Sequence, residues 1–141
     1  MTSISQLTQG LIAAFEAKDL PAALAFFADD AVVIDPHYPQ PVMKGKVAIQ
    51  QGFRWAFTNM KKPGFTVLHT WEENCIGAIE VDTHHVFRGG MKLSFQQVFV
   101  CETRDGKITR LQSYLPYAPG GIAGALTKLT RLMWRLQGKL K

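Results

Sequence analysis

The stretch that decides the fold is residues 25–36, which read AFFADDAVVIDP. Its β-branched run predicts a strand over Ala31–Asp35, because branched side chains pack well on a pleated sheet. A polar Asp-Asp pair separates that strand from a short helix, which we predict over Ala22–Phe27. Successive strand residues face opposite sides, so Val33 and Asp35 share one face. The pattern therefore places a carboxylate at the end of an apolar strand, directly before a proline.

Helical periodicity lies on both sides of this stretch. Apolar residues recur from Ile4 at the spacing of a helix with one buried face, and either Ser3 or Ser5 can cap it. Pro21 begins the second helix, because proline is tolerated in the first turn. A third helix is predicted over Lys46–Met60. Before it lies an irregular loop with three prolines, Pro36, Pro39 and Pro41.

The second half of the chain is predicted to form strands joined by short turns. Two of the three turns contain glycine, which suits tight hairpins. The predicted strands are Phe65–Trp71, Ile76–Phe87, Lys92–Glu102 and Lys107–Tyr117. Helices first and strands last, without β-α-β alternation, indicate an α+β fold with helices packed on one face of an antiparallel sheet.

The amino-acid composition excludes several classes of protein. The chain has 141 residues, 47% of them hydrophobic and 19% charged, which suits one packed domain and excludes intrinsic disorder. It has two cysteines and no Cys/His cluster, so we expect neither a disulfide framework nor a metal site. The first residues lack the pattern of a secretory signal, and we expect a cytoplasmic location.

The net charge of +5 is confined to the C-terminal segment, residues 122–141, which has five basic residues and no acidic one. The other residues have equal numbers of acids and bases, which argues against a nucleic-acid ligand. The segment predicts an amphipathic helix with leucines on one face and cations on the other. Such a helix can pack against the domain or a second chain, which is the commoner arrangement, or lie on an anionic membrane.

The order of elements resembles the cone-shaped nuclear transport factor two-like fold. The segment over residues 25–36 is similar to one shared by SnoaL-like polyketide cyclases and ketosteroid isomerases, in which Phe-Ala-Asp-Asp leads into a strand closing in Asp-Pro. The resemblance covers roughly residues 4–118. It implies a curled antiparallel sheet with N-terminal helices on its concave face, a hydrophobic cavity and a homodimer. We therefore predict a cone domain over residues 1–118 and an appended helix over 119–141, joined near Pro119-Gly120-Gly121.

Asp35 is the leading catalytic candidate. The resemblance implies that the aspartate of this Asp-Pro pair is a general base aimed into an apolar cavity. Such a base takes a proton from carbon next to a carbonyl, and desolvation strengthens it by raising its pKa. The alternative is that Asp35 only opens a turn before Pro36.

The enolate formed by such a step needs hydrogen-bond donors. The isomerases that the chain resembles use a tyrosine on the first helix and a protonated aspartate on a late strand. Leu11 stands at the tyrosine's place, and the aspartate's place falls at Gln96 or Gln97. A glutamine can donate a neutral hydrogen bond, but the missing tyrosine argues against steroid isomerisation itself.

Other side chains complete the expected site. His85 belongs to the more apolar face of the predicted strand Ile76–Phe87, where it can act as a donor, a second acid or base, or a half-buried structural histidine. Tyr114 is expected at the cavity wall, with its hydroxyl as a donor. The predicted substrate-binding residues are Phe15, Val33, Phe53, Trp55, Phe57, Gln96 and Phe99.

Two functions follow from these expectations. The first is an enzyme without a cofactor, an isomerase or cyclase in which Asp35 is the base and Gln97, Tyr114 and His85 polarise the substrate. The second is a non-catalytic protein that binds a hydrophobic small molecule, with the tail as a lid or as a membrane anchor.

Overall fold

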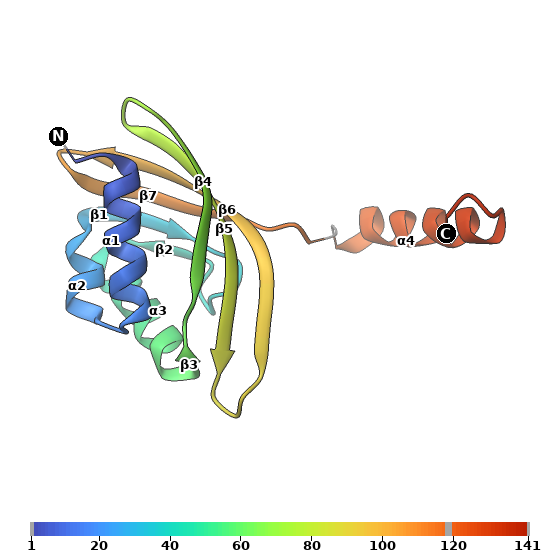
Figure 1. The fold of residues 1–141 in the computed structure, drawn as a ribbon, viewed down its shortest axis with the longest axis horizontal. Helices are drawn as coiled ribbons and strands as arrows, with labels where there is room; N and C mark the ends of the chain where they lie inside the picture. Colours follow the sequence, from blue (N-terminus) through green and yellow to red (C-terminus); the bar gives the residue numbers. More distant parts are fainter. Residues whose placement is uncertain (1, 118–119, 141) are drawn as a thin grey trace.

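The computed structural model describes residues 2–117 and 120–140 (Figure 1). Eleven elements follow one another along the chain. They are α1 (Ile4–Glu16), α2 (Leu20–Ala25), β1 (Phe27–Ile34), β2 (Val42–Lys44), α3 (Gly45–Asn59), β3 (Met60–Lys62), β4 (Phe65–Glu73), β5 (Ile76–Phe87), β6 (Lys92–Arg104), β7 (Lys107–Tyr114) and α4 (Gly121–Leu136).

All strands belong to one curled sheet. Its order is β2-β1-β7-β6-β5-β3, and β4 also pairs with β5. Every pairing is antiparallel except that of β1 with β7. Figure 1 shows α1, α2 and α3 on the concave side of this sheet. The predicted α+β fold is therefore confirmed, including the order of its helices and meander strands and the C-terminal helix.

The core lies between the helices and the concave face of the sheet. Inward residues of the central strands, such as Ile79 and Val81, are almost fully buried. Aromatic rings of the core pack edge to face against one another: the Phe53 centroid lies 5.3 Å from that of Phe15 and 5.7 Å from that of Phe27. This packing joins α1, β1 and α3 into one wall.

The region around the first strand differs from the sequence prediction. The short helix ends at Ala25, and the strand begins at Phe27 rather than Ala31. The reason is long-range, because Phe27 pairs with Ile108 on β7 and buries its ring in the core. A register shift after Phe27 leaves the Asp-Asp pair exposed on the strand. The two three-residue strands β2 and β3 were not predicted, and the last meander strand ends at Tyr114 rather than Tyr117.

The C-terminal helix α4 stands clear of the sheet in Figure 1. The predicted domain boundary at residues 118 and 119 lies outside the described residues, so the division into cone domain and appendage stays a prediction. In the described parts of the chain, no helix has the length and apolar character needed to cross a membrane.

The structure decides between the two candidate caps of α1. The Ser3 hydroxyl accepts a hydrogen bond from the Gln6 backbone at 3.1 Å, and the Gln6 side chain accepts one from the Ser3 backbone at 3.0 Å. We predict that Ser3→Ala lowers the free energy of unfolding by about 1 kcal/mol, because the backbone N–H of Gln6 loses its acceptor at the helix end. The matched change Ser5→Ala alters it by less than about 0.5 kcal/mol. Urea unfolding measures both, and equal losses would contradict the assignment.

Candidate active site

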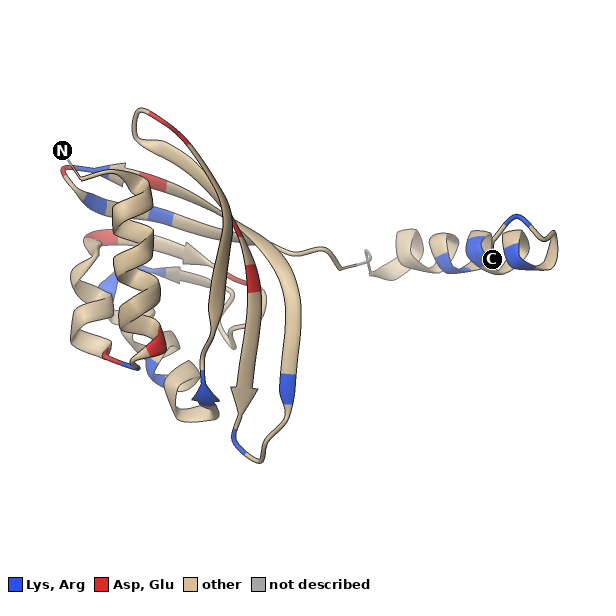
Figure 2. Ribbon diagram, in the orientation of Figure 1, with Lys and Arg blue, Asp and Glu red and all other residues tan. Residues whose placement is uncertain are grey.

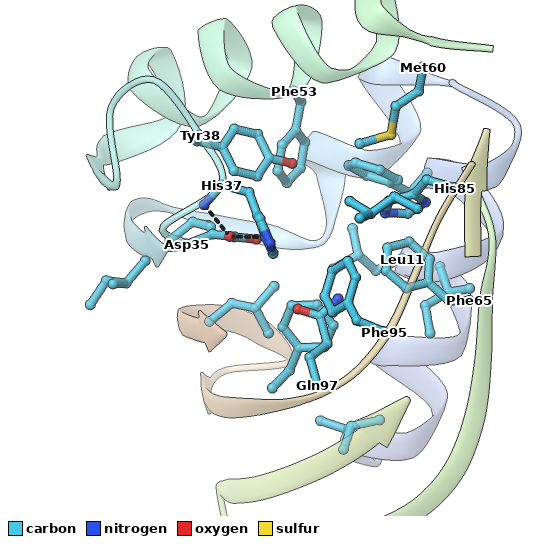
Figure 3. A pocket seen from close by; sticks show the side chains of 18 of the residues that line it. Leu11, Asp35, His37, Tyr38, Phe53, Met60, Phe65, His85, Phe95 and Gln97 are labelled. Carbon is cyan, nitrogen blue, oxygen red and sulfur yellow. Dashed lines mark hydrogen bonds and ion pairs between the residues drawn. The ribbon is translucent and has the colours of Figure 1, made fainter. Parts of the chain in front are cut away.

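A cavity of about 200 Å³ opens between the helices and the concave face of the sheet (Figure 3). Its wall is mostly apolar, with α1, α3 and the meander strands each contributing side chains. Only a few polar groups reach it, and such a pattern is typical of sites for small hydrophobic ligands. The main apolar wall residues are Leu11, Phe15, Phe53, Phe65, Phe95 and Phe99.

Asp35 lies directly after β1 and reaches into this cavity. Val33 and Asp35 are both buried and line the cavity, as the alternation along the strand predicted. The carboxylate Oδ1 accepts two hydrogen bonds from His37, one from its backbone nitrogen at 2.9 Å and one from ring Nδ1 at 3.0 Å. Within the described residues, Oδ2 has no hydrogen-bond partner. One carboxylate oxygen is thus held in place, and the other is available to a ligand.

His37 connects the carboxylate to the partly exposed edge of the cavity, here called the cavity entrance. Its ring packs against Phe95, with centroids 4.9 Å apart, and Nε2 lies 3.3 Å from the hydroxyl of Tyr117. With the Nδ1 proton directed at Asp35, Nε2 of the neutral ring accepts from that hydroxyl. The ring is partly exposed, so this arrangement fixes Asp35 from the solvent side.

Tyr38 is a functional candidate that sequence reasoning missed. Its ring contacts Phe53 and Trp55, and Figure 3 shows its hydroxyl directed into the cavity. Burial, and secondarily the nearby charge of Asp35, raise the pKa of this phenol far above its ordinary value. Tyr38 therefore keeps its proton and serves as a neutral donor. The only sequence signal was an aromatic residue three positions after Asp35, inside a loop whose prolines suggested irregular structure.

His85 brings a second neutral donor to the cavity. Its Nδ1 accepts a hydrogen bond from the Gly64 backbone at 3.1 Å. The proton of the neutral ring must therefore be on Nε2. Burial lowers the pKa of His85 to about 4, with smaller contributions from the neighbouring His84 and His37. At neutral pH the ring is an uncharged donor.

Gln97, not Gln96, faces inward, which resolves the alternative left open by the sequence. Its amide nitrogen donates to the hydroxyl of Thr83 at 2.6 Å, and its amide oxygen accepts from the hydroxyl of Ser113 at 2.6 Å. These bonds tie β5, β6 and β7 together beneath the cavity. One amide hydrogen stays available, so Gln97 acts first as a structural link between strands.

Three sequence-predicted site residues lie away from the cavity. Tyr114 is 49% exposed on the outer sheet face, because alternation along β7 turns Ser113 inward. Gln96 faces outward for the same reason on β6. Phe57 packs behind Phe15, with ring centroids 4.7 Å apart, in a second layer of the core. The other predicted residues line the cavity: Phe15, Val33, Asp35, Phe53, Trp55, His85, Gln97 and Phe99.

Sequence comparison agrees with this geometry. Residues 8–111 match the family model described as the SnoaL-like domain. The chain belongs to the SnoaL-like domain family. Among curated proteins, none matches it in sequence.

Solved structures share the fold of this SnoaL-like domain. One is a ketosteroid isomerase-like protein from Catenulispora acidiphila in complex with trimethylamine, at 18% identity and a TM-score of 0.72, covering 82% of this chain and 89% of that one. Another is a Mycobacterium tuberculosis protein in complex with estradiol-17β-hemisuccinate, at 24% identity and a TM-score of 0.69, covering 77% and 89%. A third is the Δ5-3-ketosteroid isomerase from Mycobacterium sp., at 23% identity and a TM-score of 0.69, covering 79% and 91%.

Among the described residues, no three His, Cys, Asp or Glu side chains are grouped so as to hold a metal ion. The expectation that the protein works without a cofactor stays a prediction.

The lowered pKa of His85 gives a pH-dependent stability. Between pH 6.5 and about 4 the unfolded chain binds a proton at this residue and the folded chain does not, so acidification through this window destabilises the fold. Wild type therefore loses free energy of unfolding between pH 7 and pH 4. We predict that His85→Gln makes this loss smaller by roughly 2 kcal/mol, which is less than the full pKa shift of His85 implies because the cavity admits water. The exposed control His69→Gln leaves the loss unchanged. Urea unfolding at pH 7 and pH 4 measures it, and equal losses in wild type and His85→Gln would contradict the assignment.

Proposed function

We propose that this SnoaL-like protein is an enzyme that transfers a proton at carbon next to a carbonyl group. The observation that carries the proposal is a carboxylate, Asp35, in the same apolar cavity as two neutral donors, Tyr38 and His85. A base and uncharged donors around one apolar space match the needs of enolate chemistry.

The proposed step uses the free oxygen of Asp35. Oδ2 takes the proton from the α-carbon, and the electron pair of the broken C–H bond forms the carbon–carbon double bond of an enolate. The charge that moves to the carbonyl oxygen is stabilised by hydrogen bonds from Tyr38 and His85. Asp35 then returns the proton to another carbon, which completes an isomerisation. In a cyclisation, the enolate carbon attacks a second carbonyl of the same molecule instead.

Tyr38 supplies the donor that the sequence comparison with isomerases left missing. Leu11 stands where the resemblance implies a tyrosine, and here it is an apolar part of the cavity wall. Tyr38 comes from a different segment, the loop after β1, and reaches the cavity beside Asp35. We therefore assign the main donor role to Tyr38 in place of Gln97 and Tyr114.

A second candidate function is carriage of a hydrophobic small molecule without turnover. The predominantly apolar wall favours it, because such a wall binds flat apolar compounds whatever Asp35 does. The Mycobacterium tuberculosis structure of the same fold is a complex with an estradiol derivative, which supports binding of ring compounds.

We also propose a homodimer formed through the outer face of the sheet. This face exposes Trp71, Ile76 and Tyr114, each at about half of its surface. Exposed apolar groups at this density favour an interface. A cytoplasmic location stays a prediction.

The enzymatic proposal is tested by exchange of the α-hydrogens of 2-tetralone, a flat aromatic ketone, for deuterium in D₂O, followed by NMR. We predict that Asp35→Asn lowers the protein-dependent exchange rate by at least about 10³-fold, because the amide cannot take the proton. Tyr38→Phe lowers it by about 10²-fold through loss of one donor.

The matched control is Asp29→Asn, which removes a carboxylate that lies on the same strand and is fully exposed. It should leave the rate unchanged. Binding of 2-tetralone without exchange above the solvent rate would favour the carrier function. Equal exchange by wild type and Asp35→Asn would reject Asp35 as the base.

A further inference from the structure

The C-terminal helix α4 presents an apolar face that nothing in the described chain covers. At about 100° per residue, one side of the helix collects large apolar side chains. Each of them is exposed over about half of its surface or more. Figure 1 shows the helix standing away from the other elements. These residues are Ile122, Leu126, Leu129, Leu132, Met133 and Leu136.

All charged residues of α4 are cations, and they lie away from the apolar face. They are Lys128, Arg131 and Arg135, and Lys139 follows directly after the helix. Figure 2 shows blue residues and no red ones along α4, whereas the body carries both colours. No acidic residue within this segment therefore neutralises its positive charge.

The two faces together identify the partner. A protein surface that covers the leucines satisfies the apolar face and leaves the cations without a counter-charge. A second copy of this chain has no net negative charge to attract the cations, because outside residues 122–141 its acidic and basic residues are equal in number. An anionic lipid surface satisfies both faces, since leucines enter the acyl boundary while Lys and Arg reach the headgroups.

We propose that α4 is a membrane-surface anchor that lies in the headgroup region of an anionic bilayer. Around the helix, Trp134 lies outside the apolar face, between Leu126 and Arg131. The Nζ of Lys139 lies 5.5 Å from the centre of the Trp134 ring, a distance at which a cation and an indole attract each other.

The position of α4 in the chain connects the anchor to the cavity. Tyr117, whose hydroxyl contacts His37 at the entrance, precedes the first residue of α4 by only four positions. A lipid-bound α4 therefore keeps the cavity entrance close to the bilayer, where apolar substrates concentrate. Membrane binding itself does not depend on the proposed proton transfer and can be tested separately.

Co-sedimentation of the full-length protein with vesicles tests the anchor. We expect the protein to pellet with 3:1 phosphatidylcholine–phosphatidylglycerol vesicles and to bind pure phosphatidylcholine at least about tenfold more weakly, because the cations lose their counter-charge. Leu129→Gln should lower binding to the anionic vesicles about tenfold, because one leucine that would enter the acyl boundary is lost. The matched change Thr127→Gln, toward the opposite side, should leave it within about twofold.

Three results would overturn the proposal. The first is equal binding to both vesicle types, and the second is anionic binding that Leu129→Gln leaves unchanged. The third is absence of vesicle binding together with a dimer, seen by analytical ultracentrifugation, that Leu129→Gln converts to a monomer. That last result would assign the apolar face to a second copy of the chain.

Discussion

The pairing of β1 with β7 is the constraint on which the rest of the structure depends. β1 joins the last meander strand through the parallel register that sets Val33 beside Leu111. This contact curls the sheet around α1 and α3 and encloses the cavity. It also fixes where β1 ends, and so brings Asp35 to the cavity wall. A change in this register by one residue would turn the carboxylate to the opposite face.

Burying a carboxylate among aromatic rings costs free energy unless donors compensate. Here the backbone nitrogen and the ring Nδ1 of His37 both donate to Oδ1 of Asp35. The other oxygen, Oδ2, stays available to a ligand. The donors on the same cavity are held in the neutral state by burial, through opposite pKa shifts of Tyr38 and His85. Burial in the apolar cavity thus keeps both donors uncharged, which suits the proposed enolate chemistry.

Local sequence patterns predicted the features that depend only on neighbouring residues, such as which face of a strand a side chain occupies. Alternation alone put Asp35 inward, and the same rule, anchored on the buried Leu111, would have turned Tyr114 outward. Long-range contacts decided the rest. The strand start at Phe27 follows from its pairing with β7, and the choice of Gln97 over Gln96 follows from register with β5. Tyr38 was missed because no periodicity describes an irregular loop, whose shape is set by packing on α3.

In the proposed mechanism, Asp35 faces the reacting carbon while Tyr38 and His85 donate hydrogen bonds to the carbonyl oxygen. A crystal structure with 2-naphthol tests it most directly, because this planar phenol resembles the enol of 2-tetralone. The account predicts the naphthol oxygen within about 3 Å of the Tyr38 hydroxyl and His85 Nε2, with the adjacent ring carbon next to Asp35 Oδ2. A naphthol oxygen bonded to Asp35, with only ring carbons near Tyr38 and His85, would contradict the account.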